Sequence, residues 1–253
     1  MKRIKMLVAV IAVIAAASTV TGCSEVVTIL SNDNNKVVAE GPKVRQERKI
    51  TAVDELEVSS GLSVKYIQSE ENKVVVEAPE SLIDVIATEV KGTTLKIYPK
   101  KSFRTTSGQS INIEVMAPMI VEFEASSGSS LAVSKGYVAT GRQVEIDVSS
   151  GASASVASVD AAMIDIDCGS GASCGVAGIN AAKVEADASS GASLSLQGNA
   201  ERVVLKASGG ASLSAGGLSA DRGTLTASGG ASLHGNVRNP SISSSGGGSV
   251  RNN

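Results

Sequence analysis

A phrase of five residues built almost entirely from serine, glycine and alanine recurs seven times between residue 126 and the carboxyl terminus. The central glycines of the seven copies are Gly128, Gly151, Gly171, Gly191, Gly210, Gly230 and Gly247. Successive glycines are separated by 23, 20, 20, 19, 20 and 17 residues. A nearly constant period in this range is typical of a solenoid, in which each repeat packs only against its neighbours.

The residues on either side of each glycine alternate between apolar and polar. Around Gly191 the apolar positions hold Val184, Ala186 and Ala188 before the glycine and Ala192, Leu194 and Leu196 after it. A period of two predicts a strand with one buried face on each side of the glycine. Glycine adopts a positive φ without steric cost, so the phrase itself predicts a sharp turn. A third, less regular edge contains Val159, Ile179 and Leu218, and the whole pattern predicts an all-β parallel β-helix of triangular section with short coils of about 20 residues.

The predicted core is thin at the carboxyl end. All five aromatic residues precede the last five copies of the phrase, where the inward columns hold small and aliphatic side chains. Cys168 and Cys174 fall in these inward columns. We interpret them as buried fillers, with a disulfide within the repeat as the alternative.

The amino-terminal half keeps the phrase but loosens its period. Ser59, Ser60 and Gly61 form an early copy that lies 67 residues before Gly128, and this interval has room for about three larger coils. Residues 73–77, 94–98 and 111–115 read as strands because they are alternating or β-branched. Residues 80–90 fit either a short helix or an outward loop.

The first residues resemble a bacterial export signal. Lys2, Arg3 and Lys5 precede an apolar stretch at 6–20, which is shorter than the span of about 20 residues that crosses a bilayer. Val20-Thr21-Gly22-Cys23 resembles a lipobox. We therefore predict a lipoprotein signal peptide at 1–22, a lipidated Cys23 with a spacer at 23–43, and the β-helix domain at 44–253; a plain secretory signal with a chance cysteine is the alternative.

Acidic residues form two outward columns, six and four places before the glycines. They are Glu145, Asp147, Asp165, Asp167, Glu185 and Asp187. Like charges that face each other across strands repel. Such a patch is either a solvated anionic face that keeps the sheet soluble, or a site for calcium or a cationic partner, because hard cations prefer carboxylate oxygens.

Three features in order along the chain resemble the putative auto-transporter adhesin, head GIN domain family of exported, lipid-anchored bacterial proteins. They are Leu56-Glu57-Val58-Ser59-Ser60-Gly61, then Ile86-Ala87-Thr88-Glu89-Val90 with Leu95-Lys96-Ile97, then the recurring Ser-Gly-Ala-Ser turns. The likeness spans residues 44–250. It implies a right-handed β-helix and suggests adhesion, and it implies no catalytic residues.

Composition narrows the function further. Residues 23–253 hold 20 basic and 25 acidic side chains, which argues against a nucleic-acid partner. His234 is the only histidine, so we expect no metal centre built on histidine or cysteine. Coils of 17 to 20 residues have no long loops to wall a cleft, and we expect no enzyme activity and no cofactor. We expect a structural or adhesin-like lipoprotein of the cell envelope that binds a surface glycan or a protein. We expect its lipid to anchor it in the outer membrane, and the sequence does not decide between the periplasmic and the external side. The alternatives are a β-helix that binds or degrades polysaccharides, calcium-dependent binding at the acidic columns, and self-association through the ends of the solenoid.

Overall fold

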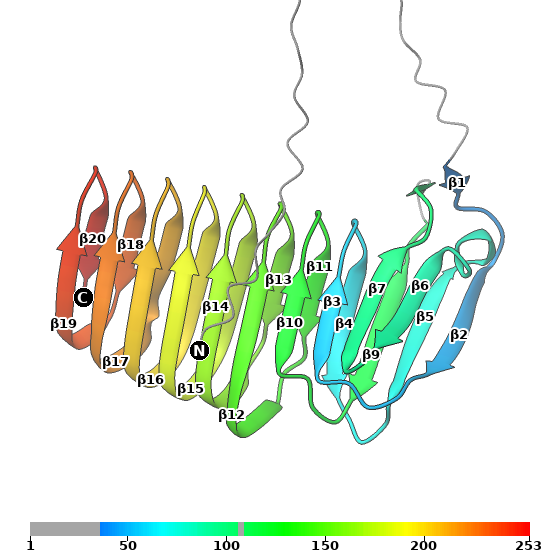
Figure 1. Ribbon diagram of the computed structural model, residues 1–253, viewed down its shortest axis with the longest axis horizontal. Helices are drawn as coiled ribbons and strands as arrows, with labels where there is room; N and C mark the ends of the chain where they lie inside the picture. Colours follow the sequence, from blue (N-terminus) through cyan, green and yellow to red (C-terminus); the bar gives the residue numbers. More distant parts are fainter. Residues whose placement is uncertain (1–35, 106–108) are drawn as a thin grey trace, which may run out of the picture. The chain divides into compact units, whose positions relative to one another are not determined.

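The Ser-Gly turns shape the whole domain. In the computed structural model, which describes residues 36–105 and 109–253, both central residues of each turn have a positive φ; Ser190 and Gly191, for example, have φ values of 52° and 73°. Two consecutive positive φ values define the type I′ turn. The first of these positions holds serine in the early coils and glycine at Gly209, Gly229 and Gly246. The predicted turns are confirmed, and they line up along the upper edge of Figure 1.

Each turn joins a strand of one parallel sheet to a strand of another. The pre-turn sheet contains, in spatial order, β7 (Thr94–Pro99), β3 (Glu55–Val58), β10 (Glu122–Ala125), β12 (Tyr137–Val148), β14 (Val159–Cys168), the later parts of β15 (Ser173–Ala188), β16 (Ser193–Ala207) and β17 (Ser212–Ala227), and β19 (Val237–Ser244). The post-turn sheet contains β9 (Asn112–Ala117), β4 (Ser63–Gln68), β11 (Ser130–Val133), β13 (Ser153–Val156), the earlier parts of β15, β16 and β17, then β18 (Ser232–Gly235) and β20 (Ser249–Asn252).

A short third side closes each coil. Val159 pairs with Ile179 on this side, and both side chains are buried, as is Leu218 two coils further along. In Figure 1 the chain rises along the pre-turn strands in front, crosses the turns and descends behind while it advances toward the carboxyl end, so the coil is right-handed. The predicted right-handed parallel β-helix with short coils is confirmed.

The amino-terminal half differs from the prediction. The coil of β3 and β4 lies directly against that of β10 and β11, although their paired positions, such as Glu55 and Glu122, are 67 residues apart in sequence. The prediction of about three larger coils in this interval is therefore wrong. The interval forms one coil, β7 with β9. Its strands β5 (Lys73–Pro79) and β6 (Ile86–Lys91) pair antiparallel, as does β2 (Lys43–Lys49) from before the interval, and these three strands cover that end of the stack.

The strands predicted at 73–77, 94–98 and 111–115 are confirmed as β5, β7 and β9. Residues 80–90 are neither one short helix nor an outward loop throughout, because they contain the single 3-10 turn η1 (Glu80–Leu82) followed by the strand β6. A separate parallel pair, β1 (Val37–Val38) and β8 (Phe103–Arg104), lies beside this region.

Arg48 fastens the covering strands together. Its guanidinium nitrogens donate to the carbonyl oxygens of Ile83 at 2.6 Å and Ile86 at 2.7 Å, so β2 is tied to the start of β6. Burial lowers the pKa of Arg48, with an opposing contribution from Asp84. A guanidinium suits this position because its planar fork satisfies two carbonyl groups at once.

The core changes in thickness along the stack. Tyr66, Phe123 and Tyr137 pack against one another in the early coils, with ring centroids 5.4 to 5.8 Å apart. The Tyr66 hydroxyl donates to the carbonyl oxygen of Ala117 at 3.1 Å, and burial raises its pKa to about 12. Later coils are filled by Ala, Val, Leu and Ile, as predicted.

Cys168 and Cys174 both lie in the core of the later coils, where they are unbonded to each other. Burial raises the pKa of Cys168 to about 11 and that of Cys174 to about 12. The interpretation of both residues as small apolar fillers is confirmed.

The carboxyl-terminal coil has an open edge. Among the described residues, β19 pairs only with β17, and β20 pairs only with β18. Ile242 pairs with the buried Leu225, but no further coil in the described part of the chain covers it, and it is consequently 50% exposed. Two features blunt this edge: Pro240 lies within β19, and the Asn252 side chain bonds the N–H and the C=O of Val237, both at 2.9 Å. Self-association through this end stays a prediction.

Overpacking one thin coil should destabilise the domain. Ala192 is 1% exposed and points inward, whereas the next residue, Ser193, points outward. We expect Ala192→Phe to lower the free energy of unfolding by roughly 1–3 kcal/mol, because a filled core must distort to accept a ring. Thermal melts of the purified variants would measure this, with Ser193→Phe as the control that adds the same ring on the outside. Equal melting temperatures for both variants would contradict the assigned core.

Candidate functional site

The predicted acidic columns lie together on the outer surface of the pre-turn sheet. Strand pairing sets Glu145 beside Asp165 and Asp165 beside Glu185, one residue per coil. Asp147, Asp167 and Asp187 form the second column in the same way. The structure thus brings all six sequence-predicted carboxylates into one patch.

The columns continue further than predicted. Glu122 and Glu124 on β10 pair with Glu145 and Asp147, and on their other side they pair with Glu55 and Glu57 of β3. The complete set is Glu55, Glu57, Glu122, Glu124, Glu145, Asp147, Asp165, Asp167, Glu185 and Asp187. We call these ten residues the acidic face. All but Asp167 are half-buried against their neighbours.

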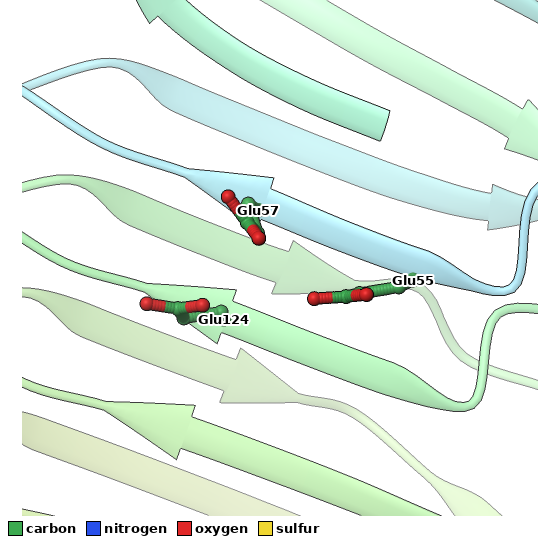
Figure 2. Close-up of side chains that lie close together, drawn as sticks. All are labelled: Glu55, Glu57 and Glu124. Atoms are coloured by element: carbon green, nitrogen blue, oxygen red, sulfur yellow. The ribbon is translucent and has the colours of Figure 1, made fainter. Parts of the chain in front are cut away.

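Three of these carboxylates come especially close together. The carboxylate oxygens that Glu55, Glu57 and Glu124 can offer to an ion lie within 4.8 Å of one another. Figure 2 shows these side chains grouped over the adjacent strands β3 and β10. Carboxylate oxygens are the ligands that hard cations such as calcium prefer. This trio is therefore the part of the acidic face best suited to hold a cation.

Basic and hydroxyl side chains border the acidic face at both ends. Thr94 donates to Glu55 at 2.6 Å, and Lys96 forms an ion pair with Glu57. At the other end, Lys206 lies on the coil after the last acidic one and pairs in register with Asp187. These contacts compensate charge at both borders of the acidic face.

Asp147, in the middle of the acidic face, has a strongly raised pKa. Burial, together with the nearby charges of Glu145, Asp167, Glu124 and Glu122, raises it to about 7. The pKa values of Asp167 and Asp187 are also raised, chiefly by burial, while Lys206 opposes the rise in both. The folded domain therefore holds carboxylates close together at an electrostatic cost.

The sequence that forms this β-helix matches a known protein family. Residues 52–253 match the family described as "Putative auto-transporter adhesin, head GIN domain". The chain belongs to this family. No curated protein is recognisably similar to this head GIN domain in sequence.

Several solved structures share the fold of this head GIN domain. A putative lipid binding protein from Parabacteroides distasonis has a TM-score of 0.72 at 20% identity, covering 86% of this chain and 99% of its own. A putative adhesin from the same species has a TM-score of 0.71 at 18% identity, covering 87% and 98%. A putative adhesin from Parabacteroides merdae has a TM-score of 0.66 at 16% identity, covering 87% and 99%. At these identities the likeness shows the fold alone.

Sequence reasoning missed four carboxylates of the head GIN domain, Glu55, Glu57, Glu122 and Glu124. The signal was present, because they stand six and four places before Gly61 and Gly128, as the other six do before their own glycines. The two copies of the phrase seemed far apart in the stack because of the long interval between them. The pairing of β3 with β10 makes them neighbours.

The raised pKa of Asp147 predicts a stability that depends on pH. The folded state keeps the Asp147 proton up to about pH 7, whereas an aspartate in an unfolded chain loses it near pH 4. The contribution of Asp147 to stability should therefore be greatest below about pH 4 and be lost as the pH rises through 7. We expect Asp147→Asn to flatten this decline between pH 5 and pH 8 and to raise the melting temperature at pH 8 by a few degrees.

Thermal melts across this pH range measure the effect. Glu201→Gln removes one exposed carboxylate from β16, outside the acidic face, and should keep the decline of the parent because Asp147 is still there. If Asp147→Asn declined with pH as steeply as the parent, crowding of the acidic face would not be the cause.

Proposed function

We propose that this head GIN protein is a non-enzymatic, adhesin-like lipoprotein of the bacterial cell envelope that binds its ligand through the acidic face. The observation that carries the proposal is the register of ten carboxylates over five consecutive coils. Holding like charges at the strand spacing of about 4.8 Å costs stability, so a positively charged ligand gains affinity by relieving that cost. The family description, which names an adhesin, supports the same general role.

A cation or a cationic partner suits this face best. The oxygens of Glu55, Glu57 and Glu124 converge within 4.8 Å, so a calcium ion could bind there and bridge the face to a ligand. One structural relative is titled a putative lipid binding protein, but the acidic face offers charged oxygens rather than apolar surface. A glycan or protein ligand with exposed positive charge remains compatible with the proposal.

Catalysis is the competing function. Paired carboxylates can perform general acid and base chemistry on polysaccharides. We favour binding because the carboxylates of the acidic face repeat along a sheet surface, where each is equivalent to the next, instead of forming one pair around a reacting bond. Binding of polysaccharide without cleavage is the nearer alternative.

Calcium should stabilise the domain through the Glu55, Glu57 and Glu124 trio. At ten times its dissociation constant, a ligand that binds only the folded state contributes about 1.4 kcal/mol, or roughly 3–6 °C in melting temperature. We expect this rise in the parent, and its loss in the double variant Glu57→Gln/Glu124→Gln.

The double variant Glu70→Gln/Glu201→Gln is the matched control, because it removes two exposed carboxylates outside the acidic face. If millimolar calcium does not raise the melting temperature of the parent, the proposed calcium site is wrong. The acidic face would then bind a cationic partner directly or serve only to keep the sheet soluble.

Lipid anchoring is the second part of the proposal. Cys23 and the segments 1–22 and 23–35 lie outside the described residues, so support comes from the lipobox-like sequence alone. Within residues 36–105 and 109–253, no helix is both long and apolar enough to cross a membrane.

Cys23→Ser should abolish lipid attachment. We expect radiolabelled palmitate to be incorporated into the parent but not the variant, and the variant to leave the membrane fraction after cell lysis. Cys174→Ser, which changes a buried cysteine of the core, is the control for nonspecific effects. Protease treatment of intact cells would then show which side of the outer membrane the anchored domain faces.

A further inference from the structure

A positively charged hollow lies at the carboxyl-terminal end of the pre-turn sheet. Its volume is about 550 Å³, and its polar lining consists of Arg202, Arg222, Arg238, Thr224, Asn239 and Ser241. None of the residues that line it, all within the described part of the chain, is acidic. The hollow therefore presents hydrogen-bond donors and positive charge to whatever enters it.

Strand register places two of its arginines, Arg202 and Arg222, in a row. Lys183 on β15 pairs with Arg202 on β16, which pairs with Arg222 on β17, which in turn pairs with Asn239 on β19. Neighbouring members are thus one strand spacing apart, about 4.8 Å. The row runs along the axis of the solenoid, outside the two columns of the acidic face.

Arg202 and Arg222 differ from the two nearby cations, Lys183 in the row and Arg238 beside its last member. Lys183 forms an ion pair with Glu185 at 2.7 Å, and Arg238 forms one with Asp221 at 3.4 Å. Within residues 36–105 and 109–253, no carboxylate lies within ion-pair distance of Arg202 or Arg222, and both are exposed. Two like charges held in register repel each other, so the folded state has a place for an anion between them.

Acidic and basic residues are also separated along the sequence. Residues 120–190 contain nine acidic and three basic side chains, whereas residues 201–253 contain two acidic and five basic ones. The acidic columns end at Glu185 and Asp187, and the next coil carries Arg202. The hollow is therefore a second charged surface, opposite in sign to the acidic face and independent of the function proposed for it.

We propose that this hollow binds the oxyanion groups of an anionic polysaccharide lying along the arginine row. Guanidinium groups donate two parallel hydrogen bonds to a carboxylate, sulfate or phosphate, and they suit such groups better than an ammonium does. Hydroxyls of Thr224 and Ser241 supply further donors at the same hollow. A row that carries cations on three consecutive coils, Lys183, Arg202 and Arg222, fits a linear ligand with repeated charges better than it fits an isolated ion.

Binding of fluorescein-labelled dextran sulfate to the purified full-length protein tests the proposal. We expect the affinity to fall about tenfold in Arg202→Gln/Arg222→Gln, the size of effect typical for losing charge-assisted hydrogen bonds, and to weaken with rising ionic strength. Arg104→Gln, which removes an exposed arginine from β8, should bind like the parent. Melting temperatures confirm folding, and the double variant should melt no lower than the parent because it relieves repulsion.

Three outcomes would overturn the proposal. The first is a double variant that binds dextran sulfate as tightly as the parent does. The second is equal binding of uncharged dextran, which would exclude oxyanion recognition. The third is displacement by free inorganic sulfate at an equal concentration of sulfate groups, which would show a simple anion site instead of a polysaccharide site.

Discussion

Stacking of identical coils in register is the constraint on which the rest of this structure depends. Every residue of one coil lies about 4.8 Å from its counterpart in the next, because backbone hydrogen bonds join the coils at the spacing of parallel strands. A residue type repeated at one position therefore becomes a continuous column on the molecule. Serine and glycine columns form the turns, alanine and leucine columns form the core, and carboxylate and arginine columns form the two charged surfaces.

The repeat made the carboxyl-terminal half predictable. Aligning the sequence on the turn glycines identifies both sheets, the buried columns and the stacked carboxylates, because local alternation and a constant period determine all of them. Cys168 and Cys174 could be interpreted correctly for the same reason, since their positions in the alignment are those of buried residues in other coils.

The amino-terminal half could not be predicted to the same depth. Local alternation identifies β5, β7 and β9 as strands, but it does not say which strand each one pairs with, or in which direction. No sequence pattern between Gly61 and Gly128 indicates that β3 and β10 are neighbours. None indicates either that β2 pairs antiparallel with β5, or β6 with β7. The full extent of the acidic face depends on that pairing. The arginine row escaped for a different reason, because it stands eight places before the glycines, where its column also contains Gln143 and Met163.

The position of β3 and β4 inside the stack has a consequence for how the chain folds. Their neighbours on one side, β7 and β9, end at Ala117, and their neighbours on the other side, β10 and β11, end at Val133. The first coil therefore cannot complete its hydrogen bonds until more than half of the polypeptide is available to it. Each later coil needs only the next 20 or so residues and a finished coil to add to. While the chain is being synthesised, the amino-terminal half thus waits to form as one unit, after which the remaining coils can be added one at a time.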